Sequence, residues 1–586
     1  MRYLNHPVNY DKYPSVRVTG TSGKAVAGWK TIVRHVANAL SDRATAIIVI
    51  DCYPGVNKAL IKERFGEFAG FQRAQWLDAD ECYLGGQALD DRLADTLTAD
   101  RVFGVMSCAN LGDYLLPDKV SACEARCEQN QGILFIIGTG AALIHAGDLV
   151  ILADYPRWQR QLDWRAGSSN WLAGNPDEDP LRKYKRGYFW EWRVADRHKR
   201  ELFPQLDFLL DSLSEPAVMI DQAAFLAGLQ ACLTTPFRLN PFFDPGIWGG
   251  KWMEEVCALP PAEKNYAWCF DGVPEENSLT LDYDGVRITM PAINLVLARP
   301  VELLGEQNYV RFGAEFPIRF DFLDTMQGGN LSLQVHPLTD YIQQHFGMHY
   351  TQDESYYILD AGEQASVYLG LKTGVTSEEF IAAVEAARLT GELDDEKYVN
   401  NFKVKKHDHV LIPAGTVHCS GSDAMILEIS ATPYIFTFKL WDWGRLGLDN
   451  TPRPVHIEHG RHVIRQQRDT QWCREQLLNT VTVTERNEAY TCERTGLHAL
   501  EFIETHRYWI NSAVDLATQG GFQMLNLIEG REAVIESPDG VFDPYTVHYA
   551  ETVIIPANIA HYRVGSLSGD PIGIIVANVV RPPEMR

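Results

Sequence analysis

The sequence has few cysteines, and their spacing is not that of a disulfide framework or a zinc finger. Eleven cysteines are spread irregularly over 586 residues, and no Cys-x-x-Cys pair occurs. Free thiols in a reducing compartment explain this pattern better than paired disulfides do. Cys123 and Cys127 lie one helical turn apart with no second pair nearby, so they give little support to a metal site. We therefore predict a cytoplasmic protein.

Long apolar segments and an excess of basic residues are also missing. No apolar run approaches the roughly 20 residues of a bilayer span, and residues 1–15 lack the apolar core of a secretory signal. The 53 Lys and Arg residues are outnumbered by 77 Asp and Glu residues, which gives a net charge of −24. This balance argues against nucleic acid or an anionic membrane as the main partner. The 46% apolar and 22% charged residues are typical of a globular protein. The length of 586 residues predicts several domains.

Residues 1–235 alternate apolar, β-branched runs with segments of helical periodicity. The clearest strand candidates are Ala46–Ile50, Gly132–Ile137 and Leu149–Ala153, whereas Thr31–Leu40 has apolar residues at helical spacing. Strands that alternate with helices are typical of an α/β layer with a mostly parallel sheet. We predict one α/β domain over this range.

Beyond the proline-rich stretch Thr234–Pro245, short β-rich runs are separated by Gly, Pro and Asp turns. This pattern of short strands and turns predicts two β jelly-roll domains, one over 236–454 and one over 455–586. A single helix interrupts the first of them. It covers Thr376–Ala387 and opens with the Thr-x-x-Glu pattern of a capping box.

The segment LSLQVHP carries the strongest chemical signal. Residues two apart on a strand share a face, so Ser332, Gln334 and His336 point to the same side. Glu354 opens a later strand, and His418 follows a Pro-Ala-Gly-Thr turn. Two imidazoles, a carboxylate and an amide oxygen suit zinc or a similar divalent metal. The spacing alone does not show that these segments meet, so ordinary core or surface histidines remain the alternative.

Several blocks in this order resemble class I mannose-6-phosphate isomerases, which are zinc-dependent enzymes of the cupin fold. The blocks are LSLQVHP, DESYYILD, VYLGLKTGVTSEEF and VLIPAGTVHCSG, and the likeness extends over about residues 238–586. The resemblance implies two cupin domains and interconversion of mannose 6-phosphate and fructose 6-phosphate. It also implies one Zn²⁺ per chain, with the ligands Gln334, His336, Glu354 and His418.

Such an isomerase moves a proton between C1 and C2 through an enediol, and it needs a Lewis acid and a base. Glu428 is our candidate base, because on its strand it faces away from the apolar Met425 and Leu427. His336 and a metal-bound water are the alternative proton carriers. The resemblance implies further site residues, namely Lys439 and Arg445 for catalysis and Ser332, Gln352 and Trp248 for substrate contacts.

Two positions depart from the family pattern. Gln352 stands where the family usually has lysine, and Lys439 stands where it usually has arginine. Arginine binds oxyanions through a planar fork, whereas lysine acts as a point charge. The departures motivate an alternative, a metal-binding cupin that binds or isomerises a different sugar. A dioxygenase cupin is a weaker alternative, because Gln334 occupies the first ligand position.

The stretch VRVTGTSGKAVAGWKTIVRHV resembles the strand–loop–helix of P-loop nucleotide kinases. There Gly20, Gly23 and Lys24 would bind nucleotide phosphate at a helix N-terminus. The motif is incomplete, since only two residues separate the glycines and Ala25 replaces the Ser or Thr that holds magnesium. We predict a degenerate P-loop-like domain over 1–235. The alternative is an active sugar kinase that binds ATP and supplies the isomerase.

Overall fold

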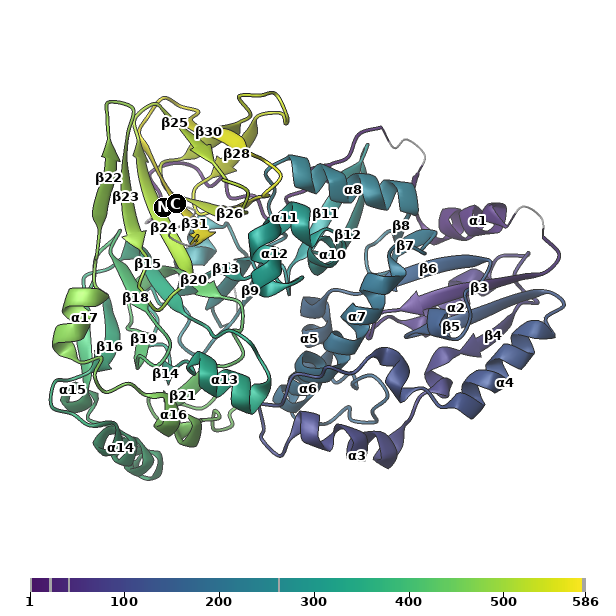
Figure 1. Cartoon of the computed structure of the whole chain (residues 1–586), viewed down its shortest axis with the longest axis horizontal. Helices are drawn as coiled ribbons and strands as arrows, with labels where there is room; N and C mark the ends of the chain where they lie inside the picture. Colours follow the sequence, from purple (N-terminus) through teal and green to yellow (C-terminus); the bar gives the residue numbers. More distant parts are fainter. Residues whose placement is uncertain (1–2, 21–23, 41–42, 262–263, 582–586) are drawn as a thin grey trace. The chain divides into compact units, whose positions relative to one another are not determined.

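The computed structural model describes residues 3–20, 24–40, 43–261 and 264–581. Internal contacts divide the chain into two compact units (Figure 1). Unit 1 comprises Met1–Pro14, Leu233–Pro274 and Pro300–Arg586, and unit 2 comprises Ser15–Cys232 and Glu275–Arg299. The chain therefore returns to unit 2 after unit 1 has begun, an excursion that no composition change in the sequence predicts.

Unit 2 is built on a seven-stranded sheet with the order β2-β8-β7-β6-β3-β5-β4. Its strands are β2 (Ala25–Ala27), β3 (Ala46–Cys52), β4 (Gln75–Asp78), β5 (Ile133–Gly138), β6 (Leu149–Asp154), β7 (Phe208–Asp211) and β8 (Val218–Asp221). The strands from β3 to β7 run parallel, and β8 and β2 join antiparallel at one edge. The mostly parallel sheet predicted from the alternating sequence pattern is thus confirmed.

The central strands β3, β5 and β6 are buried and mostly apolar, with Asp51 and Asp154 near the carboxyl ends of β3 and β6 as exceptions. Such strands are typical of a parallel sheet that helices cover on both faces. The helices of unit 2 are α1 (Trp29–Ala39), α2 (Lys58–Gly66), α3 (Gly86–Leu97), α4 (Pro117–Glu128), α5 (Arg157–Arg165), α6 (Pro180–Arg186), α7 (Trp192–Leu202), α8 (Gln222–Thr234) and α10 (Ile293–Ala298). Short 3₁₀ turns follow some strands, among them η1 (Ala79–Cys82) and η3 (Ala141–Leu143). A small sheet joins β1 (Val16–Arg17) to the returning hairpin β11 (Ser278–Tyr283) and β12 (Val286–Pro291).

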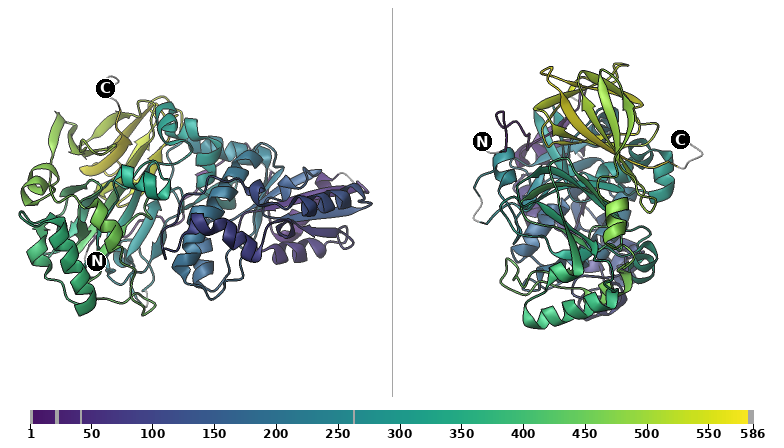
Figure 2. Two further views of the ribbon diagram at one scale, coloured as in Figure 1. Left: turned by 60° about the horizontal axis from the view of Figure 1, so that its bottom comes forward. Right: turned by 90° about the vertical axis from the view of Figure 1, so that its left-hand side faces the viewer.

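Unit 1 contains four larger sheets, which form two β-sandwiches (Figure 2). The first sandwich pairs a six-stranded sheet, β18-β15-β20-β13-β10-β9, with a five-stranded sheet, β17-β16-β19-β14-β21. The strands of the six-stranded sheet are β9 (Phe242–Asp244), β10 (Trp268–Gly272), β13 (Ile318–Asp324), β15 (Glu354–Ala361), β18 (His409–Ile412) and β20 (Ala424–Ala431). Those of the five-stranded sheet are β14 (Leu333–Val335), β16 (Ser366–Leu371), β17 (Val399–Lys403), β19 (His418–Ser420) and β21 (Phe438–Trp441).

The second sandwich pairs the sheets β22-β23-β24-β31-β26-β29 and β25-β30-β27-β28 around an apolar core. Its strands are β22 (Thr482–Arg486), β23 (Tyr490–Gly496), β24 (Ile503–Ile510), β25 (Ala513–Ala517), β26 (Gln523–Glu529), β27 (Glu532–Glu536), β28 (Tyr545–His548), β29 (Thr552–Ile555), β30 (His561–Ser566) and β31 (Ile572–Val579). Both sandwiches are largely antiparallel, as the short alternating runs predict.

The helices of unit 1 lie in the connections between strands. They are α9 (Trp252–Val256), α11 (Pro300–Leu304), α12 (Glu306–Phe312), α13 (Thr339–Phe346), α14 (Ser377–Thr390), α15 (Asp395–Tyr398), α16 (Ile457–Val463) and α17 (Thr470–Gln476). The predicted helical insertion is α14, and its capping box between Thr376 and Glu379 is present. Within the described ranges, every helix is too short or too polar to cross a bilayer.

Candidate metal centre

A row of polar side chains lines the inner face of the five-stranded sheet in the first sandwich. Ser332, Gln334 and His336 are buried along and beside β14. Gln334 pairs with His418 on β19 and with Lys439 on β21. Directly opposed residues on antiparallel strands share a face. The fold therefore brings together residues that are about 80 to 100 positions apart in the sequence.

The facing sheet supplies carboxyl groups to the same interior. Glu354 is the first residue of β15 and pairs with Ser430 on β20. Two residues further, Tyr356 pairs with Glu428, which on its other side faces Asp321 of β13. The period of two along each strand puts Glu354 and Glu428 on one face.

Three of these side chains converge on one point. The Nε2 atom of His336 lies 3.1 Å from Oε2 of Glu354, and Nε2 of His418 lies 2.7 Å from Oε1 of the same carboxylate. Their ligand atoms all lie within 4.8 Å of one another. Neither imidazole has any exposed surface, and Glu354 is 2% exposed. Among the described residues, this is the one group of three or more His, Cys, Asp or Glu side chains placed to hold a metal ion.

The hydrogen bonding of these groups fits a cation between them. Nε2 of His336 and Oε1 of Glu354 are buried without a hydrogen-bond partner of acceptable geometry, and such atoms are costly unless something satisfies them. The Nδ1 atom of His418 lies 2.9 Å from the carbonyl oxygen of Thr416, which leaves its Nε2 atom toward the cluster. The Gln334 amide is 3.3 Å from that Nε2 atom. Two nitrogens, a carboxylate and an amide suit a zinc-type ion.

The interior shifts the pKa values of Glu354 and Glu428 in opposite directions. Burial would raise the pKa of Glu354, but the adjacent His336 and His418 outweigh burial and hold it below its usual range. Burial, followed by the negative charges of Asp321 and Glu354, raises the pKa of Glu428 well above its usual range. A carboxyl group raised in this way holds a proton more tightly than an ordinary carboxylate, as a group that takes up and returns a proton requires. Burial also lowers the pKa of Lys439, to about 7.

The turn that precedes His418 is held by a buried arginine. Arg468 donates from Nη1 to the carbonyl oxygen of Pro413 at 2.5 Å and to the hydroxyl of Thr416 at 2.8 Å. The carboxylate of Asp353 accepts from the backbone N–H of Ala414 at 2.8 Å. These contacts fix the approach of His418 to the cluster. Sequence reasoning missed Arg468, because it lies far downstream in a stretch without any motif.

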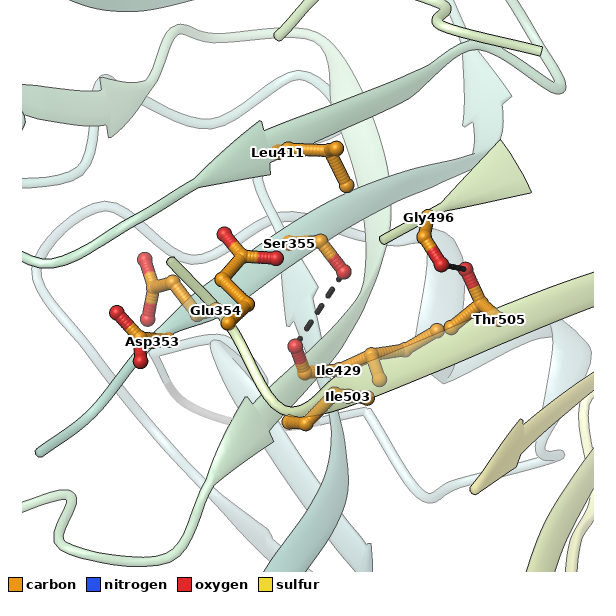
Figure 3. Close-up of a pocket in the computed structure, with 9 residues that line it drawn as sticks. Asp353, Glu354, Ser355, Leu411, Ile429, Gly496, Ile503 and Thr505 are labelled. Atoms are coloured by element: carbon orange, nitrogen blue, oxygen red, sulfur yellow. Dashed lines mark hydrogen bonds between the residues drawn. The ribbon is translucent and has the colours of Figure 1, made fainter. Parts of the chain in front are cut away.

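A small cavity lies behind the Glu354 ligand, where the two sandwiches meet. Figure 3 shows Asp353 and Glu354 at one end of it and Gly496 and Thr505 at the other. Its lining residues come from β15, β18 and β20 of the first sandwich and from β23, β24 and their connection in the second, namely Asp353, Glu354, Ser355, Leu411, Ile429, Gly496, Glu501, Ile503 and Thr505. The second sandwich thus contributes the wall behind a candidate ligand.

Gln352 lies between the two glutamates of the interior. Its Nε2 atom donates to Oε2 of Glu354 at 3.1 Å and lies 3.5 Å from Oε1 of Glu428. A neutral amide therefore stands where the family resemblance implies an ammonium group. It links the candidate ligand to the candidate base without adding charge.

Ser332 and Arg445 meet in a cluster around Asp442. Ser332 donates to Oδ1 of Asp442 at 2.9 Å, and Arg445 donates to the same atom at 2.8 Å. Arg453 contacts both Ser332 and Asp442 at 2.9 Å. Sequence reasoning did not single out Arg453, which lies in the stretch TPRPVHIEHG downstream of β21. Trp248 is placed differently from these residues, since it is 1% exposed and packs edge-on against Trp268 with ring centroids 4.7 Å apart.

Comparison with known proteins gives different results for the two units. Residues 28–234, all but the last two of which belong to unit 2, match the model of a domain of unknown function, DUF8485. ManA, a mannose-6-phosphate isomerase of Bacillus subtilis, is 25% identical over 308 residues, which cover 52% of this chain and 88% of that protein. The mannose-6-phosphate isomerase of Streptococcus mutans is 22% identical over 340 residues, covering 56% of this chain and 95% of that protein.

A solved structure of the mannose 6-phosphate isomerase from Bacillus subtilis covers 59% of this chain and all of its own length, with 19% identity and a TM-score of 0.48. The sequence matches show homology to class I mannose-6-phosphate isomerases over about half of the chain. The predicted resemblance is therefore confirmed at the level of homology.

In unit 2, the structure corrects the position predicted for a phosphate-binding loop. A P-loop joins a strand to a helix, with the lysine at the helix start. Lys24 leads instead into strand β2, which pairs antiparallel with β8. Gly20 lies before this edge strand, and Gly23 lies outside the described residues. The prediction of a strand–loop–helix at Gly20–Lys24 is wrong, because residues 25–27 extend the sheet.

The connection from β3 to α2 does have the order strand, loop, helix. Lys58 is the first residue of α2, and the motif spacing puts Cys52, Asn57 and Ala59 at the other defining positions. Only the lysine of the motif is kept. The sequence does contain a signal for this loop, since the predicted strand Ala46–Ile50 is followed by a Pro-Gly turn and then Lys58.

The side chains around Lys58 are already satisfied within the protein. Its Nζ atom lies 2.6 Å from Asp78 and 2.5 Å from Asp80. The side chain of Asn57 caps α2 by accepting from the backbone N–H of Leu60 at 3.0 Å. A phosphate group at this loop would have to compete with both carboxylates and with this cap.

Proposed function

We propose that unit 1 is a zinc-dependent aldose–ketose isomerase that interconverts mannose 6-phosphate and fructose 6-phosphate, with one ion per chain. The observation that carries the proposal is the convergence of His336, Glu354 and His418 inside the first sandwich, with buried ligand atoms that lack hydrogen bonds. Homology to mannose-6-phosphate isomerases over about half of the chain supports the same reaction class.

Gln334, His336, Glu354 and His418 would hold the ion. When bound, the ion supplies a Lewis acid that polarises the carbonyl group of the sugar and stabilises negative charge on its oxygen atoms. The polar contact of His418 with Thr416 and the Arg468-held turn keep this ligand in one orientation.

Glu428 is the proposed base that moves the proton between C1 and C2 through an enediol. It is 6% exposed and faces the same interior as Glu354. Its raised pKa suits a group that must accept a proton from one carbon and return it to the next. Gln352 orients it through an amide contact at 3.5 Å. His336 is a weaker candidate for this role, because its free nitrogen faces the ion site.

The phosphate of the substrate would lie at the other end of β14. Ser332 precedes Gln334 by two residues, a distance of about 7 Å along a strand. Arg453 donates to Ser332, and Arg445 and Arg453 both contact Asp442. Lys439 is opposite Gln334 on β21. Two arginines beside one carboxylate leave a net positive charge, which favours a phosphorylated sugar over a neutral one.

The departures at Gln352 and Lys439 support one alternative, a metal-binding cupin that binds or isomerises a different sugar. Gln352 donates its amide N–H to Glu354 and lies close to Glu428. Because the amide is neutral, it adds no positive charge for a substrate. Lys439 has only a point charge where a bidentate arginine is usual. This alternative keeps the ion and changes the substrate.

The test is turnover of fructose 6-phosphate to mannose 6-phosphate by the full-length protein, before and after chelation and with zinc restored. We expect activity that depends on zinc and that is lost in His336→Ala. Absence of turnover by a folded, zinc-loaded protein would reject the phosphomannose assignment. The same assay with unphosphorylated and differently phosphorylated hexoses would then separate a different sugar from a pure binding role.

A second candidate function is nucleotide binding by unit 2, as part of a bifunctional sugar kinase and isomerase. The observation in its favour is Lys58 at the start of α2, directly after the parallel strand β3. The chain leaves β3 toward β4 on one side of the sheet and leaves the neighbouring strand β6 toward β7 on the other. The strand order therefore reverses between β3 and β6, where ligands of such sheets bind. The ion pairs of Lys58 with Asp78 and Asp80 weigh against tight binding.

ATP binding by the full-length protein tests this second candidate. Residues 275–299 belong to unit 2, so a fragment that ends at residue 235 would be incomplete. If the loop binds ATP, then Lys58→Ala should abolish binding, while Lys62→Ala should retain it, because Lys62 lies on the same helix and only reaches Asp78 at 3.6 Å. Wild-type protein that binds no ATP at millimolar concentration would remove the kinase hypothesis.

A further inference from the structure

Two cysteine thiols in unit 2 contact each other although they are 41 residues apart. The Sγ atoms of Cys82 and Cys123 are separated by 3.4 Å. Cys82 ends the 3₁₀ turn η1, and Cys123 lies in the middle of α4, which packs against η1. A disulfide bond has a sulfur–sulfur distance of about 2.0 Å, so the two sulfurs need to approach by little more than 1 Å.

The two thiols differ in their access to solvent. Cys82 is 1% exposed, whereas Cys123 is partly exposed on the surface of α4. A dissolved reagent therefore reaches Cys123 first. Across the part of the chain that the structure describes, no other pair of cysteines is recorded in thiol–thiol contact. Cys127, one turn further along α4, is buried, and Cys108 is exposed.

We propose that Cys82 and Cys123 are a redox-active pair that closes into a reversible disulfide when the protein meets a small-molecule disulfide such as oxidised glutathione. The pair is reduced at rest in a reducing compartment. Closure covalently joins η1 to α4.

The reaction is two successive thiol–disulfide exchanges. The thiolate of Cys123 attacks one sulfur of oxidised glutathione, the glutathione disulfide bond breaks, and one glutathione thiolate leaves and takes up a proton. The thiolate of Cys82 then attacks Sγ of Cys123, and a second glutathione leaves. Two protein thiols lose two electrons and two protons in total, and one oxidised glutathione becomes two reduced molecules.

The environment of Cys82 makes the second exchange the slow one. In the reduced pair, burial and then the contact with Cys123 raise the pKa of the Cys82 thiol to about 12, and burial remains once Cys123 carries glutathione. Because only the thiolate attacks, the closing step should accelerate as the pH rises. The mixed disulfide on Cys123 should therefore accumulate transiently before the intramolecular bond forms.

Closure acts on a charged part of unit 2. The turn η1 also carries Asp80, which pairs with Lys58 and accepts from the backbone N–H of Thr139 at 3.0 Å. Joining Cys82 to α4 restrains Asp80 and thereby the ion pair at the start of α2. This inference does not depend on the isomerase proposed for unit 1 or on nucleotide binding by unit 2.

The test uses the full-length protein, fully reduced and freed of reductant, in a Cys108→Ser background that removes the exposed thiol. After incubation with oxidised glutathione, intact mass and non-reducing peptide mapping identify the products. We expect the loss of two hydrogen atoms and one cross-linked peptide pair that contains Cys82 and Cys123. Dithiothreitol should reverse both.

Single variants separate the steps and keep the proposal falsifiable. Cys82→Ser should stop at one glutathione adduct on Cys123, and Cys123→Ser should leave Cys82 unmodified. Cys127→Ser, on the same helix, should form the cross-link as the parent does. The proposal is overturned by a folded parent protein that gains only a stable glutathione adduct, or by a cross-link that survives in Cys82→Ser. A thermal shift measured with each sample establishes that the variants are folded.

Discussion

The two sandwiches of unit 1 share an architecture but differ in the side chains that they enclose. The first sandwich encloses His336, Glu354 and His418, all almost fully buried. The second encloses aliphatic and aromatic side chains, such as Leu527, Val553 and Tyr562. The site therefore comes from the side chains that point inward on a few strands, and the fold alone does not create it.

A pair of similar turns makes this difference concrete. In the first sandwich the sequence IPAGTVH ends at His418, which begins β19 and has no exposed surface. In the second sandwich the sequence IPANIAH ends at His561, which begins β30 and is exposed. The same local pattern thus yields a candidate ligand in one place and a surface residue in the other. Burial beside Gln334 and Glu354, and not the turn itself, distinguishes them.

The largest expected effect follows from this pair of histidines. His418→Ala removes one of three converging ligands, so metal affinity should fall by more than about 100-fold, and isomerase turnover should be lost with it. His561→Ala, the matched change in the second sandwich, should bind one ion per chain as the parent does. Metal content after dialysis and turnover with added zinc check both. Equal metal loss in the two variants would contradict the difference between the sandwiches.

The next effect separates ion binding from proton transfer inside the first sandwich. Glu428→Gln keeps the size of the side chain but removes the base, so turnover should fall roughly 100- to 10,000-fold while the ion remains bound. Glu485→Gln, on the exposed strand β22, serves as the control and should keep its activity. Exchange of the C2 proton of the sugar with solvent reports the same step. Full proton exchange in Glu428→Gln would exclude this residue as the base.

Much of the first sandwich could be predicted because its signals are local. The alternation in LSLQVHP, the Pro-Ala-Gly-Thr turn and the capping box of α14 each depend on neighbouring residues. The pairing of Gln334 with both His418 and Lys439 depends on strand register, which a single sequence does not encode locally. Family resemblance supplied that information before the structure did.

The phosphate-binding loop predicted at Gly20–Lys24 shows where local signals mislead. Glycines and Lys24 suggested a loop, but a loop of this kind is defined by the strand before it and the helix after it. The run Ala46–Ile50 was recognisable as a strand, and Lys58 follows it at the motif spacing. Without the glycines of the motif the local signal is weak, and the parallel sheet around β3 makes the position of Lys58 clear. The return of residues 275–299 to unit 2 is likewise a long-range contact without a local signal.

A smaller loss of metal affinity is expected when the turn before His418 is no longer held by Arg468. Arg468→Lys keeps the charge but loses the guanidinium group whose Nη1 atom contacts Pro413 and Thr416. Because the turn positions His418, metal affinity should fall about 10- to 100-fold, as for other residues that orient a ligand. Arg474→Lys, on the exposed side of α17, is the control. Competition with a chromophoric chelator measures the affinity. Unchanged affinity in Arg468→Lys would show that the turn is held without this arginine.

The smallest effect concerns the junction of the two sandwiches, where Asp271 of β10 accepts from the backbone N–H of Thr552 of β29 at 3.2 Å. Burial raises the pKa of Asp271 to about 7, although the nearby Arg238 and the hydrogen bonds of Thr552 and Tyr10 lower it. The native state then binds a proton that the unfolded state releases near its ordinary pKa of about 4. Stability from this group is complete below pH 4 and is lost as the pH rises through 7.

Asp271→Asn should therefore flatten the pH dependence of unfolding between about pH 5 and 8, with a shift of a few degrees in the midpoint at pH 8 relative to pH 5. Asp515→Asn is the control, because this exposed carboxylate pairs with Arg563, which lowers its pKa. Its contribution changes only below about pH 4, and an exposed pair contributes little. Thermal unfolding followed across that pH range distinguishes the two. If Asp271→Asn leaves the pH slope unchanged, the carboxyl group at the junction is ionised throughout, and the charge of the nearby Arg238 outweighs burial.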